Sequence, residues 1–314
     1  MDGIINIYKE TGFTSHDAVA KLRGIVRQRK IGHTGTLDPM AEGVLPVCLG
    51  NATKACEYLT DHEKEYTAVM RLGVTTDSQD ATGTVFRTTD PGCTEEQRRA
   101  CVKEFEGEQL QLPPMFSAVW VDGKRLYDLA RKGKTVEREK RRIMIHEIEV
   151  QSICFPLVTL RIVCSKGTYI RTLCNDIGER LGCGAMMESL LRTRVGTFTL
   201  EEAKTLQQIE QARDENRLSD LLLPTDRIFL SLPSIQVREE DDRLVKNGNP
   251  VPARYLKESR NESPAACGPH DGIVPLDPDG CVRVYLSDGS FTAVYRMNRK
   301  RGMLMPEKMF ISEG

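Results

Sequence analysis

The sequence contains no apolar run close to the ~20 residues that a membrane-spanning helix requires. Its first residues, Met-Asp-Gly-Ile-Ile-Asn, place no basic segment ahead of an apolar one, so we expect no secretory signal peptide. Hydrophobic residues make up 39% of the chain and charged residues 28%, as in ordinary globular proteins. We therefore expect a protein that has no membrane partner and is located in the cytoplasm.

Motifs for metals, disulfides and nucleotide cofactors are also missing. The ten cysteines form no Cys-x-x-Cys pair and the five histidines are scattered, which favours reduced cysteines and no metal site. The glycine-rich loops that bind phosphates, Gly-x-Gly-x-x-Gly and Gly-x4-Gly-Lys-Ser/Thr, do not occur. We expect a protein that works without a metal or an organic cofactor.

A large excess of charge is absent as well, because the formal net charge is −1. A protein of this kind that binds nucleic acid must use local basic patches, since neutralised phosphates supply much of the affinity. Two such patches are present. The first consists of Lys21, Arg23, Arg27, Arg29 and Lys30, and the second places nine Lys or Arg against four Asp or Glu between residues 121 and 145. Charge runs usually form solvated faces, but acidic residues gather elsewhere, which favours a binding surface.

The most informative segment is a loop at residues 31–46, Ile-Gly-His-Thr-Gly-Thr-Leu-Asp-Pro-Met-Ala-Glu-Gly-Val-Leu-Pro. It holds a single aspartate, Asp38, among three glycines and directly before Pro39. A residue before proline is pushed into an extended conformation, and glycines permit turns that other residues cannot make. The loop either displays a nucleophile or proton acceptor, or is an ordinary turn with a capping aspartate.

Hydrophobic periodicity predicts an alternation of strands and helices up to about residue 228. We predict strands at 3–8, 64–73, 143–151, 157–164 and around 190–195. We predict one helix capped by Ser15, one at 52–59, one that begins at the Thr94 capping box, one after Gly167 and one over 201–222. A basic insert of about 112–142, a hairpin or helix-turn arm, interrupts this pattern.

From about residue 229 the pattern changes to short strands and turns. We predict a strand at 235–237, a helix at 239–247, a hairpin around Ser287-Asp288-Gly289 and a last strand at 303–311, with a Pro- and Gly-rich stretch at 256–280. The chain is therefore divided into residues 1–228 and a compact β-domain at 229–314.

Four segments in this order resemble the bacterial tRNA pseudouridine synthase B family. They are the Asp38 loop, Lys-Glu-Tyr-Thr-Ala-Val-Met-Arg-Leu-Gly at 64–73, Gln-Leu-Pro-Pro-Met-Phe-Ser-Ala within 111–133, and Ser-Lys-Gly-Thr-Tyr-Ile-Arg-Thr-Leu at 165–173. The family isomerises the T-loop uridine at conventional tRNA position 55. The resemblance implies an α+β fold, in which a mixed, mostly antiparallel sheet is flanked by helices, and a small C-terminal PUA-like RNA-binding domain. A small β-barrel without a ligand is the alternative for that domain.

The resemblance assigns the catalytic residues. Asp38 is the carboxylate that acts where sugar and base join, Arg171 pairs with it, and Tyr66 stacks on the flipped base and is a candidate for removing its C5 proton. A guanidinium beside Asp38 should depress the pKa of its carboxyl group by about 1–3 units. The sequence leaves open whether the carboxylate attacks ribose C1′ or uracil C6, or only stabilises charge. Without the motifs, Tyr66 would be a core residue and Arg171 a helix-surface arginine.

The resemblance also assigns substrate contacts. Tyr169 and Leu190 line the base pocket, although Leu191 could serve equally, and His33 fills the space that the flipped uridine leaves. Lys9 matches a family lysine, with Glu10 in place of the usual proline. Phe116 stands where the family often has tyrosine.

The basic insert would grip the tRNA T-arm through Arg131, Lys132, Arg141 and Arg142. We therefore predict an isomerase, a tRNA pseudouridine synthase that acts as a monomer without an obligate protein partner. A guide-RNA-dependent synthase subunit and a non-catalytic tRNA-binding or folding factor are the alternatives.

Overall fold

The structure, a computed structural model, describes residues 1–121, 123–258 and 280–311. Its largest sheet has the strand order β1-β3-β12-β4-β11-β10-β7, with β2 beside β3 and β13 beside β12. Among the described strands of this sheet, only β12 and β3 pair in parallel. The strands are β1 (Gly3–Lys9), β2 (Ile31–His33), β3 (Glu42–Leu49), β4 (Lys64–Leu72), β7 (Gly107–Gln111), β10 (Arg141–Cys154), β11 (Leu157–Cys164), β12 (Ala185–Val195) and β13 (Phe198–Thr199). The mixed, mostly antiparallel sheet of the prediction is confirmed.

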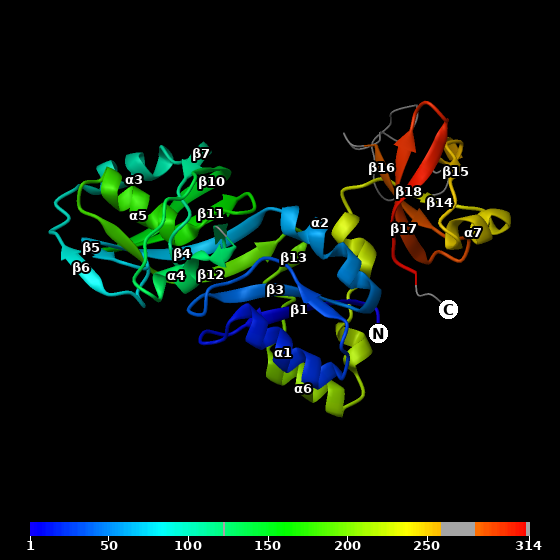
Figure 1. Ribbon diagram of the computed structural model, residues 1–314, viewed down its shortest axis with the longest axis horizontal. Coiled ribbons are helices and arrows are strands. Elements are labelled where there is room, and N and C mark those ends of the chain that lie inside the picture. The colour runs from blue at the N-terminus through cyan, green and yellow to red at the C-terminus, as the bar shows by residue number, and fades with distance from the viewer. Residues whose placement is uncertain (122, 259–279, 312–314) are drawn as a thin grey trace.

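Helices pack on this sheet in two groups (Figure 1). At the β1 end α1 and α6 lie side by side, while α5 packs on the central strands β12 and β4 and α3 packs on β10. The helices are α1 (Ser15–Val26), α2 (Cys56–Asp61), α3 (Glu95–Lys103), α4 (Leu126–Ala130), α5 (Ile170–Arg180) and α6 (Leu206–Asp214), with 3-10 turns η1 (Gly50–Ala55), η2 (Leu218–Leu221) and η3 (Thr225–Phe229). Two hairpins lie outside the sheet, β5 (Val74–Thr76) with β6 (Val85–Thr88), and β8 (Trp120–Val121) with β9 (Lys124–Arg125).

Alternation along β4 shows how the sequence produces the core. Tyr66, Ala68, Met70 and Leu72 are buried on one side of the strand, as the period of two predicts, while the residues between them are partly exposed. Helix α5 packs its apolar residues on this surface, in the same core cluster. The central strand therefore places Tyr66 at the edge of the core, on the side that α5 covers.

The C-terminal domain is a second sheet of order β14-β16-β17-β18-β15, which lies apart from the first in Figure 1. Its elements are β14 (Ser234–Gln236), α7 (Glu239–Lys246), β15 (Val251–Pro252), α8 (Tyr255–Glu258), β16 (Cys281–Tyr285), β17 (Phe291–Asn298) and β18 (Met303–Met309). The predicted hairpin is present as β16 and β17. Aromatic contacts of Phe229 with Tyr58, Phe291 and Phe310 join this sheet to the N-terminal part of the chain. Most of the 256–280 stretch lies outside the described residues.

Three local predictions are wrong. Residues 31–46 are not a loop throughout, because Ile31–His33 form β2 and Glu42–Leu49 form β3 of the large sheet. Thr14, not Ser15, caps α1, because its side chain accepts a hydrogen bond from the Asp17 backbone and Asp17 bonds back to Thr14. The 201–222 stretch is not one helix, because Thr205 forms a capping box with Gln208 and starts α6 only at Leu206. The basic insert is confirmed as an arm with a short hairpin, β8–β9, followed by a short helix, α4.

Candidate active site

A cavity of about 1210 Å³ collects side chains that are distant in the sequence. Asp38, Tyr66 and Arg171, the three predicted catalytic residues, all line it. Five of the predicted substrate contacts line it as well, namely His33, Phe116, Arg131, Tyr169 and Leu190. Because these residues come from the Asp38 loop, β4, β12, the insert and the start of α5, the cavity is a product of the tertiary fold.

The Asp38 loop is anchored at both of its ends. The Ser15 hydroxyl accepts a hydrogen bond from the Leu37 backbone N–H at 2.8 Å. Beyond Asp38, Lys9 Nζ donates to the carbonyl of Ala41 at 2.5 Å. Gly43 has a φ of +106°, and a Cβ there would lie 2.2 Å from the Arg192 carbonyl oxygen. Only glycine therefore allows β3 to approach β12 this closely.

Lys9 was predicted to bind substrate, and the structure places it differently. Its side chain is buried and donates only to backbone carbonyls, those of Glu10, Pro39 and Ala41. It is not among the residues that line the cavity. Burial lowers the pKa of Lys9 to about 8, against a smaller opposing effect of Asp38. Lys9 supports the loop that carries Asp38, and its role as a substrate contact stays a prediction.

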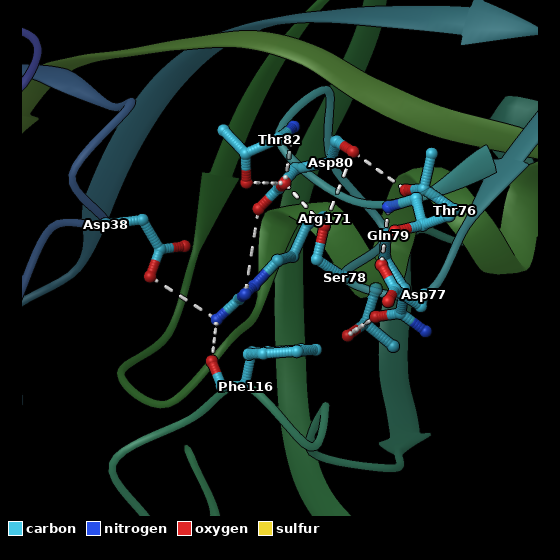
Figure 2. Close-up of polar contacts among 11 residues, drawn as sticks. Asp38, Thr76, Asp77, Ser78, Gln79, Asp80, Thr82, Phe116 and Arg171 are labelled. Atoms are coloured by element: carbon cyan, nitrogen blue, oxygen red, sulfur yellow. Dashed lines mark hydrogen bonds and ion pairs between the residues drawn. The ribbon is translucent and has the colours of Figure 1, made fainter. Parts of the chain in front are cut away.

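Arg171 connects three segments of the chain (Figure 2). Its Nη2 lies 3.3 Å from Asp38 Oδ1 and donates to the Phe116 carbonyl at 2.6 Å, and its Nη1 lies 3.7 Å from Asp80 Oδ2. The Arg171 side chain is only 5% exposed, so the helix-surface alternative is wrong. The guanidinium group thus joins the Asp38 loop, the segment with Asp80 and the start of the insert.

Asp80 was missed by sequence reasoning. Its side chain is 5% exposed, and its Oδ1 accepts hydrogen bonds from the hydroxyls of Ser78 and Thr82, both at 2.6 Å. The available signal was the segment Thr-Thr-Asp-Ser-Gln-Asp-Ala-Thr-Gly-Thr at 75–84. Such a segment is typical of an exposed turn. Only the fold shows that its second aspartate faces Arg171.

The predicted direction of the Asp38 pKa is wrong. Burial raises the pKa of the Asp38 carboxyl group above its ordinary value, and this effect outweighs the opposing charge of Arg171. Asp80 raises the pKa further, because its negative charge faces the same guanidinium. The Asp38 side chain is 33% exposed and shares Arg171 with Asp80, so its carboxylate is not enclosed in an ion pair of its own.

Arg192 is a second buried arginine beside the site. It lies directly opposite Tyr66 on the paired strands β12 and β4 and is 1% exposed. Its guanidinium group donates to the carbonyls of Val44 at 2.7 Å and Gly35 at 3.1 Å, and also hydrogen-bonds the Tyr66 side chain. Burial raises the pKa of Tyr66 to about 12, while Arg192 opposes the increase. Arg192 therefore fixes Tyr66 relative to the loop of Asp38.

Tyr169 and Leu190, which were predicted to line a base pocket, both line the cavity. Leu190 is buried and lines the cavity, whereas Leu191 does not line it. Tyr169 is held by Gln111, whose amide accepts from its backbone N–H at 2.8 Å and donates to its carbonyl at 3.0 Å. Burial, and then Arg192, lower the pKa of His33, whose Nδ1 is buried without a hydrogen-bond partner among the described residues.

Three of the predicted basic contacts lie outside the cavity. Lys132, Arg141 and Arg142 are exposed on the insert and on the first residues of β10. Arg142 forms an ion pair with Glu108 at 3.1 Å. Within the described residues there is no group of three or more His, Cys, Asp or Glu that could hold a metal, and no helix there is both long and apolar enough to cross a membrane.

Two family models match the chain in succession. The first is described as TruB family pseudouridylate synthase (N terminal domain) and matches residues 23–170. The second, tRNA pseudouridylate synthase B C-terminal domain, matches residues 171–230. All three predicted catalytic residues lie inside these matches.

Curated relatives and solved structures agree with the models. The tRNA pseudouridine synthase B of Lachnoclostridium phytofermentans is 45% identical over 99% of this chain and 100% of its own length. That of Burkholderia mallei is 41% identical over 99% of this chain and 98% of its own length. A solved Cbf5-Nop10-Gar1 complex contains a chain with a TM-score of 0.72 and 28% identity, over 98% of this chain and 85% of that one. An H/ACA RNP bound to a substrate RNA that contains 2′-deoxyuridine contains another, with a TM-score of 0.72 and 25% identity over 99% of this chain and 85% of that one.

Proposed function

Because this chain belongs to the TruB family of pseudouridylate synthases, we propose that the cavity around Asp38 is where it isomerises the T-loop uridine of tRNA, conventional position 55, to pseudouridine. The chain is an isomerase of tRNA modification. The observation that supports the location best is the convergence of Asp38, Tyr66 and Arg171 on one cavity.

Asp38 is the nucleophile in this proposal. Isomerisation breaks the bond between ribose C1′ and uracil N1, turns the base and joins C1′ to C5. An ionised carboxylate at the sugar can attack covalently or stabilise positive charge that develops at C1′. The contact of 3.3 Å between Arg171 and Asp38 orients the carboxylate, and the Phe116 carbonyl and Asp80 hold the arginine in place.

Tyr66 supports the base during its rotation. Its ring lies at the end of the buried row of β4 and lines the cavity, so it offers a face for stacking. The hydrogen bond with Arg192 directs its hydroxyl group and makes a negative charge there less unfavourable. Tyr66 is the candidate for removing the C5 proton after the new bond has formed. Because its pKa is raised to about 12, its hydroxyl group is protonated at neutral pH and must lose that proton before it can act as the base.

The substrate must enter with its uridine flipped out of the T-loop, which costs a few kcal/mol. His33, five residues before Asp38, would occupy the space that the base leaves. Arg131 lines the cavity, and Lys132, Arg141 and Arg142 are exposed nearby on the arm and β10 for contacts to the T-arm backbone. Residues 1–228 would form the catalytic domain and residues 229–314 a PUA-like RNA-binding domain.

The enzyme would act alone, as a monomer in the cytoplasm. The guide-RNA-dependent alternative is supported less, because solved chains of those complexes are 25–28% identical to this one whereas curated tRNA pseudouridine synthases B reach 45%. A non-catalytic RNA-binding factor would have no need for a buried arginine that is shared by two carboxylates.

The test is to map pseudouridine in a T-arm hairpin after incubation with the purified protein alone. We expect product with the wild type and none with Asp38→Asn, which should still bind the hairpin because the arm is unchanged. Product from Asp38→Asn would overturn the role of Asp38. No product from the wild type without added proteins would favour the guide-RNA-dependent alternative.

A further inference from the structure

The single tryptophan of the chain is exposed at the mouth of the cavity. Trp120 lies in β8 of the insert, its side chain is 62% exposed, and it is among the residues that line the cavity with Asp38. Burying a large apolar side chain stabilises a folded protein by about 1.5–3 kcal/mol, and the exposed Trp120 does not contribute this free energy. The fold instead presents an indole ring to whatever enters the cavity.

The backbone around Trp120 is ordered by the arm itself. The Leu126 N–H donates to the Val119 carbonyl at 2.9 Å, and the Tyr127 N–H donates to the Ser117 carbonyl at 3.0 Å. The Leu126 side chain is fully buried and anchors the start of α4. These hydrogen bonds join the residues just before Trp120 to the start of α4, so Trp120 does not project from an unsupported loop.

Basic and aromatic side chains alternate next to Trp120. Arg125 pairs with it across the β8–β9 hairpin, and its guanidinium carbon lies 5.2 Å from the indole ring and 5.7 Å from the ring of Tyr127. The guanidinium carbon of Arg131 lies 5.5 Å from the centre of the same Tyr127 ring. All four side chains line the cavity. Rings interleaved with arginines are the composition of surfaces that stack unpaired bases and hold their phosphates.

We propose that Trp120 is a stacking platform for one unpaired base of the RNA loop, a second base site beside the one that receives the target uridine. The proposal rests on the proposed function, since it takes a tRNA loop as the ligand. Arg125 holds the indole from one side and supplies positive charge for the neighbouring phosphate, and the open face of the ring receives the base. The site selects an unpaired loop, because a base within a duplex has no free face to offer.

The lone tryptophan makes the contact directly observable. We expect a T-arm hairpin to quench the fluorescence of the Asp38→Asn protein, which binds without turnover, because a stacked base quenches indole emission. The same RNA should not quench when the loop is closed into a continuous duplex of equal length. An emission that does not change at saturating hairpin would overturn the proposal.

Affinity gives a second, independent measurement. Trp120→Ala should weaken hairpin binding about 5- to 100-fold, the range for losing one stacked base, and Trp120→Phe should stay within about threefold of the wild type. The salt dependence of binding should be unchanged, because the lost contact carries no charge.

The chain offers a matched control. Phe155 is also exposed, at 53%, and stacks with an arginine, Arg98, at 5.0 Å, but it is not among the cavity residues. Phe155→Ala should bind the hairpin as the wild type does. Equal affinities of Trp120→Ala and Phe155→Ala would overturn the stacking site.

The base can be identified with hairpins that carry one abasic position each. For one abasic hairpin, the affinity for the wild type should be as low as the affinity of the intact hairpin for Trp120→Ala. That abasic hairpin should bind Trp120→Ala with the same affinity as it binds the wild type. Additive losses at every position would overturn the proposal. Pseudouridine formation by the wild type separates the two hypotheses, because product without quenching removes only the Trp120 site, whereas absence of product removes the proposed function.

Discussion

Asp80 holds Arg171 from the side opposite Asp38, with its Oδ2 3.7 Å from Arg171 Nη1 and both side chains only 5% exposed. The arginine is therefore fixed by a second carboxylate, which lines the same cavity as Asp38. Asp38 and Asp80 thus share one guanidinium group, and Asp38 is the closer partner at 3.3 Å.

Asp80→Asn should lower the turnover number by about 10- to 100-fold, because removing one partner of a buried ion pair releases Arg171 to bind Asp38 more tightly and disturbs its position. Hairpin affinity should change less than turnover, since the exposed basic side chains of the arm are unchanged. Asp77→Asn is the control, because Asp77 belongs to the same segment but accepts from the Thr84 backbone at 2.8 Å. Equal turnover numbers for the two variants would contradict this role of Asp80.

The raised pKa of Asp38 gives a prediction on pH. Single-turnover rates should fall about tenfold per pH unit below this pKa, because only the ionised carboxylate reacts. The same shift makes ionised Asp38 less favourable in the folded than in the unfolded chain, so its ionisation lowers the free energy of unfolding as the pH rises from ~4 through the raised pKa. Asp38→Asn should therefore be more stable than the wild type at pH ~7, and the gain should vanish below pH ~4. Urea unfolding of the wild type and of Asp38→Asn at neutral and at acidic pH measures this difference in stability. A variant less stable than the wild type at neutral pH would mean that the Arg171 charge affects the Asp38 pKa more than burial does.

Arg192→Leu should lower the free energy of unfolding by about 3–5 kcal/mol, because it leaves the buried carbonyls of Gly35 and Val44 without donors. It should also lower turnover, since Tyr66 and the Asp38 loop lose their common contact. The control is Arg194→Leu on the same strand, where the arginine is 27% exposed and pairs with Glu63 at 2.7 Å; the change there should be about 1 kcal/mol or less. Similar losses of unfolding free energy in both variants would show that the buried contacts of Arg192 stabilise the fold no more than those of Arg194.

The insert should carry part of the electrostatic affinity. Arg131→Glu and Lys132→Glu should each weaken hairpin binding and reduce the slope of log Kd against log salt by about 1. Arg142→Glu should have a smaller effect, because Glu108 already neutralises this arginine. Arg217→Glu, at an arginine that pairs with Glu215, is the control. A salt slope that is the same in all four variants would remove the insert from the RNA interface.

Much of the site could be predicted because its chemistry is encoded locally. The Asp38 loop is defined by glycines and a proline that restrict the backbone, and the alternation at 64–73 places Tyr66 on a buried face. Asp80, Arg192 and Trp120 were not predicted. Their residue types are common in turns, strand surfaces and apolar patches, and nothing in their immediate neighbours distinguishes them.

From the amino-acid sequence alone we could predict strands β1, β4, β10, β11 and β12 of the large sheet, the starts of α3, α5 and α7, the display of one acid in a restricted loop and the basic character of the arm. These features depend on propensities and spacing within a few residues, whereas β3, beside the Asp38 loop, was not predicted. The tertiary structure decided which charges share a guanidinium group and in which direction the acid titrates. Those outcomes depend on burial and on distances of a few ångströms between segments up to 133 residues apart. Because burial and a nearby opposite charge shift a carboxyl pKa in opposite directions by similar amounts, the geometry decides the direction of the net shift.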